Sequence, residues 1–215
     1  STGTLTELYE PGEEIEPAAW EALEAIVARE LDRGDVGALA FSGSLPPGAP
    51  TDGYARIARI AVTRSVPVLA DAYGPALALV LAECPAVVKV NAAEAGDATG
   101  LTVGDAASAA AAARVLRERG AAAVVVTIGI AGAVVVSATG EARLVPPDIR
   151  GAYPVGSGDA FLAGLAAALV DGQPLLEAAR LGMAAGIANA LLPGAGELDP
   201  TSAERLVPGV AITAM

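Results

Sequence analysis

The chain has 215 residues, of which 53% are hydrophobic and 18% charged, so it can bury a substantial core and is not a disordered chain. Its 13 basic and 25 acidic residues give a formal net charge of −12, which argues against binding nucleic acid through a broad basic surface. A single cysteine, Cys84, excludes an internal disulfide, and the absence of histidine leaves acid–base chemistry to carboxylates or lysine.

Predicted strands and helices alternate along the first half of the chain. A short strand is expected over 4–10. An amphipathic helix begins at Pro17 and ends near Gly34, because apolar residues recur there at three- and four-residue spacing. A buried strand is predicted over 36–41. The alternation continues with helices over 52–63, 74–82, 92–99 and 105–119, the last capped by Asp105, and with strands over 66–69 and 87–90.

The second half begins with strands and ends with helices. Strands are predicted over 122–128, 133–137 and 142–145, and helices over 158–170, 174–191 and 201–206. Strands that alternate with helices of this length predict a parallel sheet covered on both faces, and ligands of such sheets bind beyond the carboxyl ends of the strands. Clusters of glycine and polar residues fall at those ends, over 42–48, 89–94, 127–132 and 156–159.

No segment has the features of a membrane span or a secretion signal. A span needs about 18 consecutive apolar residues, and a signal needs a charged segment followed by an apolar one at the N-terminus. The sequence has neither feature. We therefore expect a cytoplasmic protein that does not contact a membrane.

The turn Gly156-Ser157-Gly158 opens one of the predicted helices. Three small residues leave main-chain N–H groups unobstructed at a helix N-terminus, where they can hold an anion or a developing negative charge. The carboxylate of Asp159 would stand beside that anion, as a base for phosphoryl transfer does. The same string on its own is also compatible with Asp159 simply capping a helix.

Four strings resemble the phosphofructokinase-B, or ribokinase-like, family of sugar kinases, and they occur in the family's order over nearly the whole chain. Residues 154–164, Pro-Val-Gly-Ser-Gly-Asp-Ala-Phe-Leu-Ala-Gly, resemble the C-terminal signature. Residues 42–48 resemble the strand-end loop of the phosphosugar branch, which includes 1-phosphofructokinase and tagatose-6-phosphate kinase. Residues 89–94 resemble the Lys-Pro-Asn-x-x-Glu motif, with Val90 in place of proline, and residues 127–133 resemble the nucleotide-binding turn.

The resemblance implies a ribokinase-like α/β fold, a three-layer α/β/α sandwich with a mainly parallel central sheet. Family members begin with a Gly-rich sugar-binding motif and a small β-sheet lid, and neither precedes Ser1. We therefore expect an N-terminally truncated domain that lacks most of the lid. Residues 1–12 would be a remnant of the lid or substrate region, and residues 13–215 would form the nucleotide-binding and catalytic domain.

The resemblance also implies roles for individual residues. Asp159 would deprotonate the sugar hydroxyl, with the amides of Gly156, Ser157 and Gly158 as an anion hole. Gly43 and Ser44 would contact the substrate. Residues implied in ATP binding are Lys89, Asn91, Glu94, Thr127, Gly129, Gly132 and Asn189. Asn91 and Glu94 would also organise Mg²⁺, the glutamate through water.

Three of these assignments have structural alternatives. Lys89 could be a solvent-facing lysine at the end of a strand. Gly129 and Gly132 could do no more than form a hairpin turn. Asn189, a lone polar residue in an alanine-rich helix, could equally be a structural hydrogen-bonding residue or face the adenine.

The implied activity is transfer of the γ-phosphoryl group of ATP to a hydroxyl of a ketohexose phosphate. Fructose 1-phosphate is the first candidate and tagatose 6-phosphate the second, each giving the bisphosphate. Potassium is a candidate activator, because the loop before the signature can bind a monovalent cation in this family, and a homodimer is left open. The alternatives are a truncated, non-catalytic nucleotide-binding fragment and a ribokinase-like kinase for another sugar.

Overall fold

The computed structural model of the chain describes residues 10 and 12–215. The strand predicted over 4–10 lies outside the described residues except for Glu10, and most of the predicted remnant over 1–12 lies outside them as well. None of the helices in the described part of the chain is long and apolar enough to cross a lipid bilayer.

Among the described residues, seven strands form one sheet whose spatial order follows the chain order. They are β1 Leu39–Ser42, β2 Val68–Asp71, β3 Val87–Asn91, β4 Ala123–Thr127, β5 Ala133–Ser137, β6 Gly140–Val145 and β7 Ala211–Ala214. The first four strands pair in parallel, and the pairs from β4 to β7 are antiparallel. The sheet is therefore parallel on the side where helices alternate with strands, and antiparallel where short turns join the strands.

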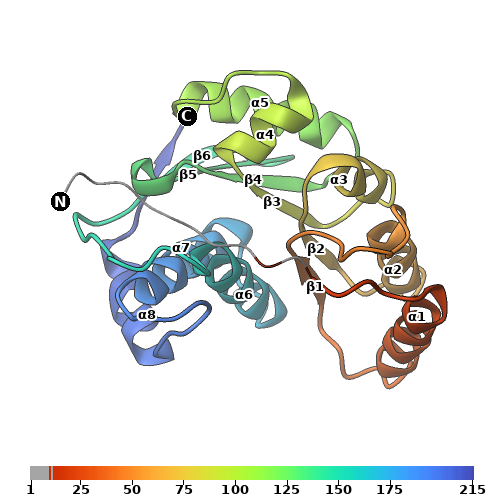
Figure 1. Cartoon of the computed structure of the whole chain (residues 1–215). Coiled ribbons are helices and arrows are strands. Elements are labelled where there is room, and N and C mark those ends of the chain that lie inside the picture. Colours follow the sequence, from red (N-terminus) through yellow and green to blue (C-terminus); the bar gives the residue numbers. More distant parts are fainter. Residues whose placement is uncertain (1–9, 11) are drawn as a thin grey trace.

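Helices cover both faces of this sheet (Figure 1). One layer contains α1 Pro17–Leu31, α2 Gly53–Val62, α3 Gly74–Leu81, α4 Ala92–Thr99 and α5 Ala106–Glu118. The other contains α6 Ser157–Val170 and α7 Leu175–Ala190, with α8 Pro200–Leu206 packed on α7. The arrangement confirms the predicted three-layer α/β/α sandwich.

The two hydrophobic cores follow from the alternation of side chains along each strand. On β3, Val88 and Val90 lie in the core beneath α3 to α5, whereas Val87 lies in the core beneath α6 and α7. Successive side chains of a strand point to opposite faces, so a strand buried on both sides is apolar throughout. Lys89 interrupts this run on the face that α6 covers.

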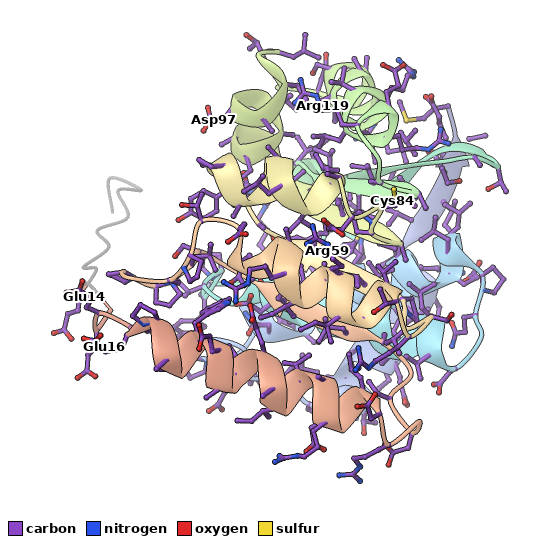
Figure 2. The ribbon with its side chains drawn as sticks, turned by 90° about the vertical axis from the view of Figure 1, so that its right-hand side faces the viewer. Glu14, Glu16, Arg59, Cys84, Asp97 and Arg119 are labelled. Carbon is purple, nitrogen blue, oxygen red and sulfur yellow. The ribbon has the colours of Figure 1, made fainter. Side chains whose placement is uncertain are left out.

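Exposed polar contacts join neighbouring helices of the first layer, and Figure 2 shows where two of their arginines, Arg59 and Arg119, lie. Arg59 on α2 pairs with Glu83, just after α3, at 2.5 Å, and Arg119 at the end of α5 donates to the carbonyl oxygen of Ala98 on α4 at 2.6 Å. Surface ion pairs of this kind contribute at most about 1 kcal/mol each. The two cores must therefore supply most of the stability.

Within residues 12–215, the predicted elements are confirmed to within a few residues, with one exception. The strand predicted over 36–41 begins only at Leu39 and is half-exposed, because it lies at the edge of the sheet and not inside it. The short strand β7 was not predicted. Asp105 is confirmed as a cap, since its carboxylate accepts a hydrogen bond of 2.8 Å from the N–H of Ser108.

Each of the four parallel strands ends in a polar residue. These residues are Ser42, Asp71, Asn91 and Thr127. Ser42 pairs in register with Asp71, and Asn91 with Thr127. Parallel strands bring their carboxyl ends to one edge, so the expected gathering of polar residues along that edge is confirmed.

The contact between α6 and α7 depends on glycine at position 182. A Cβ atom there would lie 2.7 Å from the carbonyl oxygen of Phe161 and 3.0 Å from its ring. We expect Gly182→Ala to lower the free energy of unfolding by about 1–3 kcal/mol, because the clash involves main chain that cannot move freely.

Urea denaturation monitored by circular dichroism measures the free energy of unfolding, and Gly104→Ala is the matched control. A Cβ at Gly104 would meet nothing within 4 Å, and we expect no loss of stability there. Equal stability of the two variants would show that α6 and α7 are not packed as closely as described.

Candidate active site

Glycine is required at the turn that leads into α6. Gly156 precedes the helix with a φ of 82°, a left-handed conformation, and a Cβ there would lie 2.2 Å from the main-chain nitrogen of Gly196. Both the conformation and the close approach exclude a larger residue. The turn closes when the N–H of Ser157 donates to the carbonyl oxygen of Pro154 at 3.1 Å.

This hydrogen bond corrects one of the anion-hole assignments. The amide of Ser157 is already bonded within the turn, so it is not free to hold an anion. Within residues 12–215, the N–H groups of Gly156, Gly158 and Asp159 have no acceptor. The free amides at the start of a helix, together with its positive dipole end, favour a bound anion.

The carboxylate of Asp159 is exposed beside these amides. Its Oδ1 atom accepts a hydrogen bond of 2.6 Å from the hydroxyl of Ser42, the last residue of β1. The same hydroxyl lies 3.3 Å from Oδ2 of Asp71, at the end of β2. Asp159 is thus turned toward the sheet edge and not into the protein interior.

Lys89 lies directly beneath the turn. Its side chain is only 5% exposed, and its ammonium pairs with Oδ2 of Asp71 at 2.5 Å. The solvent-facing alternative for this lysine is therefore wrong. A Cβ on Gly158 would lie 2.8 Å from Nζ of Lys89, so the buried ammonium is a close neighbour of the free amides. Asp71 offsets part of its charge.

Asn91 and Glu94 cap α4 for each other. The side-chain oxygen of Asn91 accepts from the N–H of Glu94 at 3.0 Å, and Oε2 of Glu94 accepts from the N–H of Asn91 at 2.8 Å. No hydrogen-bond partner of Oε1 of Glu94 occurs in the described part of the chain. This oxygen is available to a metal-bound water.

The donor set is compatible with Mg²⁺. In the part of the chain that the structure describes, no three acidic, histidine or cysteine side chains gather to hold a metal ion. Mg²⁺ commonly keeps several waters and binds through one or two carboxylates together with the phosphates of a nucleotide. One free carboxylate oxygen of Glu94 at the sheet edge fits that mode of binding.

A cavity of about 420 Å³ lies between the turn after β4 and the start of α6. Predicted site residues that line it are Thr127, Gly129, Gly132, Ser157 and Gly158. Gly129 and Gly132 lie in the hairpin turn between β4 and β5, and they also line the cavity. The structural alternative and the predicted place in a binding site are therefore compatible. The cavity brings the residues of two sequence motifs into one site.

The segment 146–151 forms another wall of this cavity and was missed by the sequence analysis. It contributes apolar Pro146, Pro147 and Ile149 together with charged Asp148 and Arg150. Apolar walls with few polar groups are typical of sites for small ligands such as a nucleotide base. No motif marked this segment, because its role depends only on where the chain passes in space.

Asn189 supports the turn before α6. It is fully buried on α7, and its Nδ2 donates to the carbonyl oxygen of Val155 at 2.9 Å and to the hydroxyl of Ser157 at 3.1 Å. Its burial and these two hydrogen bonds favour the structural alternative over a contact with the adenine. The buried amide holds the turn before α6 from behind.

Gly43 and Ser44 lie just beyond β1. The N–H of Gly43 donates to the carbonyl oxygen of Asp71 at 2.9 Å, and the residue has a left-handed φ of 93°. Ser44 is exposed, and its carbonyl oxygen is 3.5 Å from the hydroxyl of Tyr54. Burial is the main cause that raises the pKa of Tyr54, so its hydroxyl stays protonated and can donate at neutral pH.

Two residues of the site had no role assigned from the sequence. Ser42 and Asp71 both contact charged groups of the site, yet neither stands out in a motif on its own. A usable signal was their position as the last residue of adjacent parallel strands. Such residues meet at one edge, whatever the sequence between them.

The chain is similar to sugar kinases both in sequence and in structure. The model of the pfkB family of carbohydrate kinases matches residues 4–202. A 1-phosphofructokinase of Rhodobacter capsulatus is 39% identical over 180 residues, 84% of this chain and 57% of that protein. An ATP-dependent 6-phosphofructokinase isozyme 2 of Mycobacterium tuberculosis is 33% identical over 177 residues, 80% of this chain and 52% of that protein.

Among solved structures, phosphofructokinase-2 from Escherichia coli in complex with potassium superposes with a TM-score of 0.84 and 26% identity. The match covers 96% of this chain and 67% of that one. The chain therefore spans only about half the length of the curated relatives described above. Because the family model nevertheless matches nearly all of its residues, the chain belongs to the pfkB family of carbohydrate kinases.

Proposed function

We propose that this chain provides the nucleotide-binding and catalytic part of an ATP-dependent sugar-phosphate kinase. The observation that carries the proposal is the exposed carboxylate of Asp159 beside the free amides of Gly156 and Gly158. A base next to an anion site, at the edge of a nucleotide-sized cavity, is the arrangement that phosphoryl transfer requires. Residues 13–215 would form this domain.

In the proposed reaction, Asp159 takes the proton of the sugar hydroxyl as its oxygen attacks the γ-phosphorus of ATP. The amides of Gly156, Gly158 and Asp159 donate to the phosphoryl oxygens as negative charge develops on them. Lys89, nearly buried below the turn, adds positive potential. The chain thus contributes a base and a fixed set of donors, and it forms no covalent bond with the substrate.

ATP would occupy the cavity between the β4–β5 turn and α6. Thr127, Gly129 and Gly132 would line the nucleotide, with the segment 146–151 as another wall. Asn91 and Glu94 would face the phosphates from the end of β3, the glutamate through water. When bound, Mg²⁺ would neutralise charge on the phosphates that are being separated.

The proposed acceptor is a ketohexose monophosphate, with fructose 1-phosphate as first choice and tagatose 6-phosphate as second. The similarity to a protein named 1-phosphofructokinase supports the first choice, and the similarity to a 6-phosphofructokinase adds fructose 6-phosphate to the compounds to be tested. Gly43 and Ser44 would contribute to the substrate site.

Potassium activation is also a proposal for this chain. It is supported by the potassium that accompanies the similar E. coli structure and by the main chain of the segment before Gly156, which lies along the cavity. A homodimer and a cytoplasmic location remain predictions.

A panel of sugar phosphates, assayed with the complete protein, tests the acceptor. We expect the highest kcat/KM with fructose 1-phosphate, and less with tagatose 6-phosphate, fructose 6-phosphate and unphosphorylated fructose. Preference for an unphosphorylated sugar would favour the alternative of a kinase for another sugar. Calorimetric binding of ATP·Mg²⁺ without turnover of any compound would favour a non-catalytic nucleotide-binding protein.

The role of Asp159 is tested by Asp159→Asn in the complete protein. We expect kcat to fall roughly 10²–10⁴-fold while the Kd for ATP changes little, since the base acts in the transition state. Asp171→Asn is the matched control, because Asp171 is an exposed residue at the opposite end of α6. Near-normal turnover of Asp159→Asn would remove this residue from the mechanism.

Glu94→Gln tests the metal assignment without removing the helix cap, because glutamine can serve as the third residue of a capping box. We expect the Mg²⁺ concentration for half-maximal activity to rise by roughly tenfold or more, as is common when outer ligands of a metal are changed. Glu177→Gln, in the first turn of α7, is the control. An unchanged Mg²⁺ requirement in Glu94→Gln would contradict the assignment.

A further inference from the structure

A row of polar side chains crosses the sheet beneath the start of α6. Ser42 and Asp71 are register partners at the ends of β1 and β2. Leu69 of β2 and Val87 of β3 are also register partners, and both lie in the core under α6. Asp71 follows Leu69 by two residues, and Lys89 follows Val87 by two residues. Side chains two residues apart share a face of a strand, so all three polar side chains point toward α6.

In this row the hydroxyl of Ser42 stands between two carboxylates. Its oxygen is 2.6 Å from Oδ1 of Asp159 and 3.3 Å from Oδ2 of Asp71. A hydroxyl has one proton to donate, and only the shorter distance falls within the usual range for O–H···O hydrogen bonds. The ammonium of Lys89 contacts Oδ2 of Asp71, so that carboxylate has a partner without the serine. The proton of Ser42 is therefore directed to Asp159.

The two oxygens of Asp159 are consequently not equivalent. Oδ1 accepts from Ser42, whereas Oδ2 has no hydrogen-bond partner among the described residues. A carboxylate with one oxygen fixed to the end of a strand can rotate little about its side-chain bonds. Its second oxygen is then held in a defined direction beside the free amides of the turn.

We propose that Ser42 is a positioning residue for Asp159, an inference that rests on the proposed kinase function. The hydroxyl holds Oδ1 and leaves Oδ2 as the basic atom. In the reaction, the O–H bond of the sugar breaks and its proton goes to Oδ2. The electron pair of that bond forms the new bond to the γ-phosphorus, and the bond from the γ-phosphorus to ADP breaks with its electron pair on ADP. Ser42 keeps its own proton throughout.

Ser42→Ala and Ser42→Thr in the complete protein test this role. Alanine removes the hydroxyl, and we expect kcat to fall roughly 10- to 100-fold, as for a reacting group displaced by about 1 Å. The KM for the sugar phosphate and the Kd for ATP should change little. Threonine keeps the hydroxyl, and its extra methyl group has space because residue 42 is exposed, so it should restore most of kcat. Ser137→Ala, at the end of β5, is the control.

Three outcomes would overturn the proposal. Unchanged kcat in Ser42→Ala would show that Asp159 needs no anchor. A rise in KM with kcat unchanged would make Ser42 a contact to the substrate and not a positioning residue. A threonine variant as impaired as the alanine variant would point to a steric role of the loop.

Crystal structures of the wild-type and Ser42→Ala proteins separate this inference from the proposed function. If the wild-type protein phosphorylates no compound of the panel, the kinase proposal fails, but the anchor can still be observed directly. We expect the carboxylate of residue 159 to leave its wild-type position in Ser42→Ala. The same side-chain conformation in both structures would overturn the positioning role, whatever the activity.

Discussion

The arrangement of the site depends on the buried ion pair between Lys89 and Asp71. Burying a charge without a partner is strongly unfavourable, and breaking a buried pair by removing one member typically costs about 3–5 kcal/mol. The pair joins the end of β2 to the middle of β3, close to the edge where the polar residues gather. It also satisfies the carboxylate of Asp71, which leaves the hydroxyl of Ser42 to Asp159. One electrostatic contact thus affects how the last side chains of β1 and β2 are paired.

The second constraint is the close approach of main chain around α6. Gly158 lets the helix start directly over the ammonium of Lys89, and Gly182 and Gly186 of α7 let the two helices pack with their main chains nearly in contact. The buried amide of Asn189 fixes the turn from the other side. The free amides are therefore held by packing on three sides, and such preorganised donors are the most effective in stabilising developing charge.

Much of the fold could be predicted from the sequence, because strands and helices of this chain have distinct periodicities and glycine marks the turns between them. The turn Gly156-Ser157-Gly158 and the carboxylate after it could also be found, since their spacing is local. Errors arose where a residue's role depends on the direction of its side chain in space. A solvent-facing Lys89 was one of the readings left open, yet the lysine is buried in an ion pair. Asn189, in an alanine-rich helix, could equally have faced a ligand, yet its amide supports a turn. The bonded amide of Ser157 and the contact of Ser42 with Asp159 likewise appear only when the elements are assembled.

The strand β1, which ends in Ser42, lies at an edge of the sheet. Leu39 and Gly43 donate to the carbonyl oxygens of Pro67, just before β2, and Asp71, at its end. The main-chain groups of Ala40 and Ser42 therefore face away from β2, and in the described part of the chain no strand pairs on that side. Such an edge can accept another extended segment through main-chain hydrogen bonds. An added strand would clamp residue 42 between two neighbours and restrict its motion. A segment bound at this edge would therefore also restrict the hydroxyl that contacts Asp159.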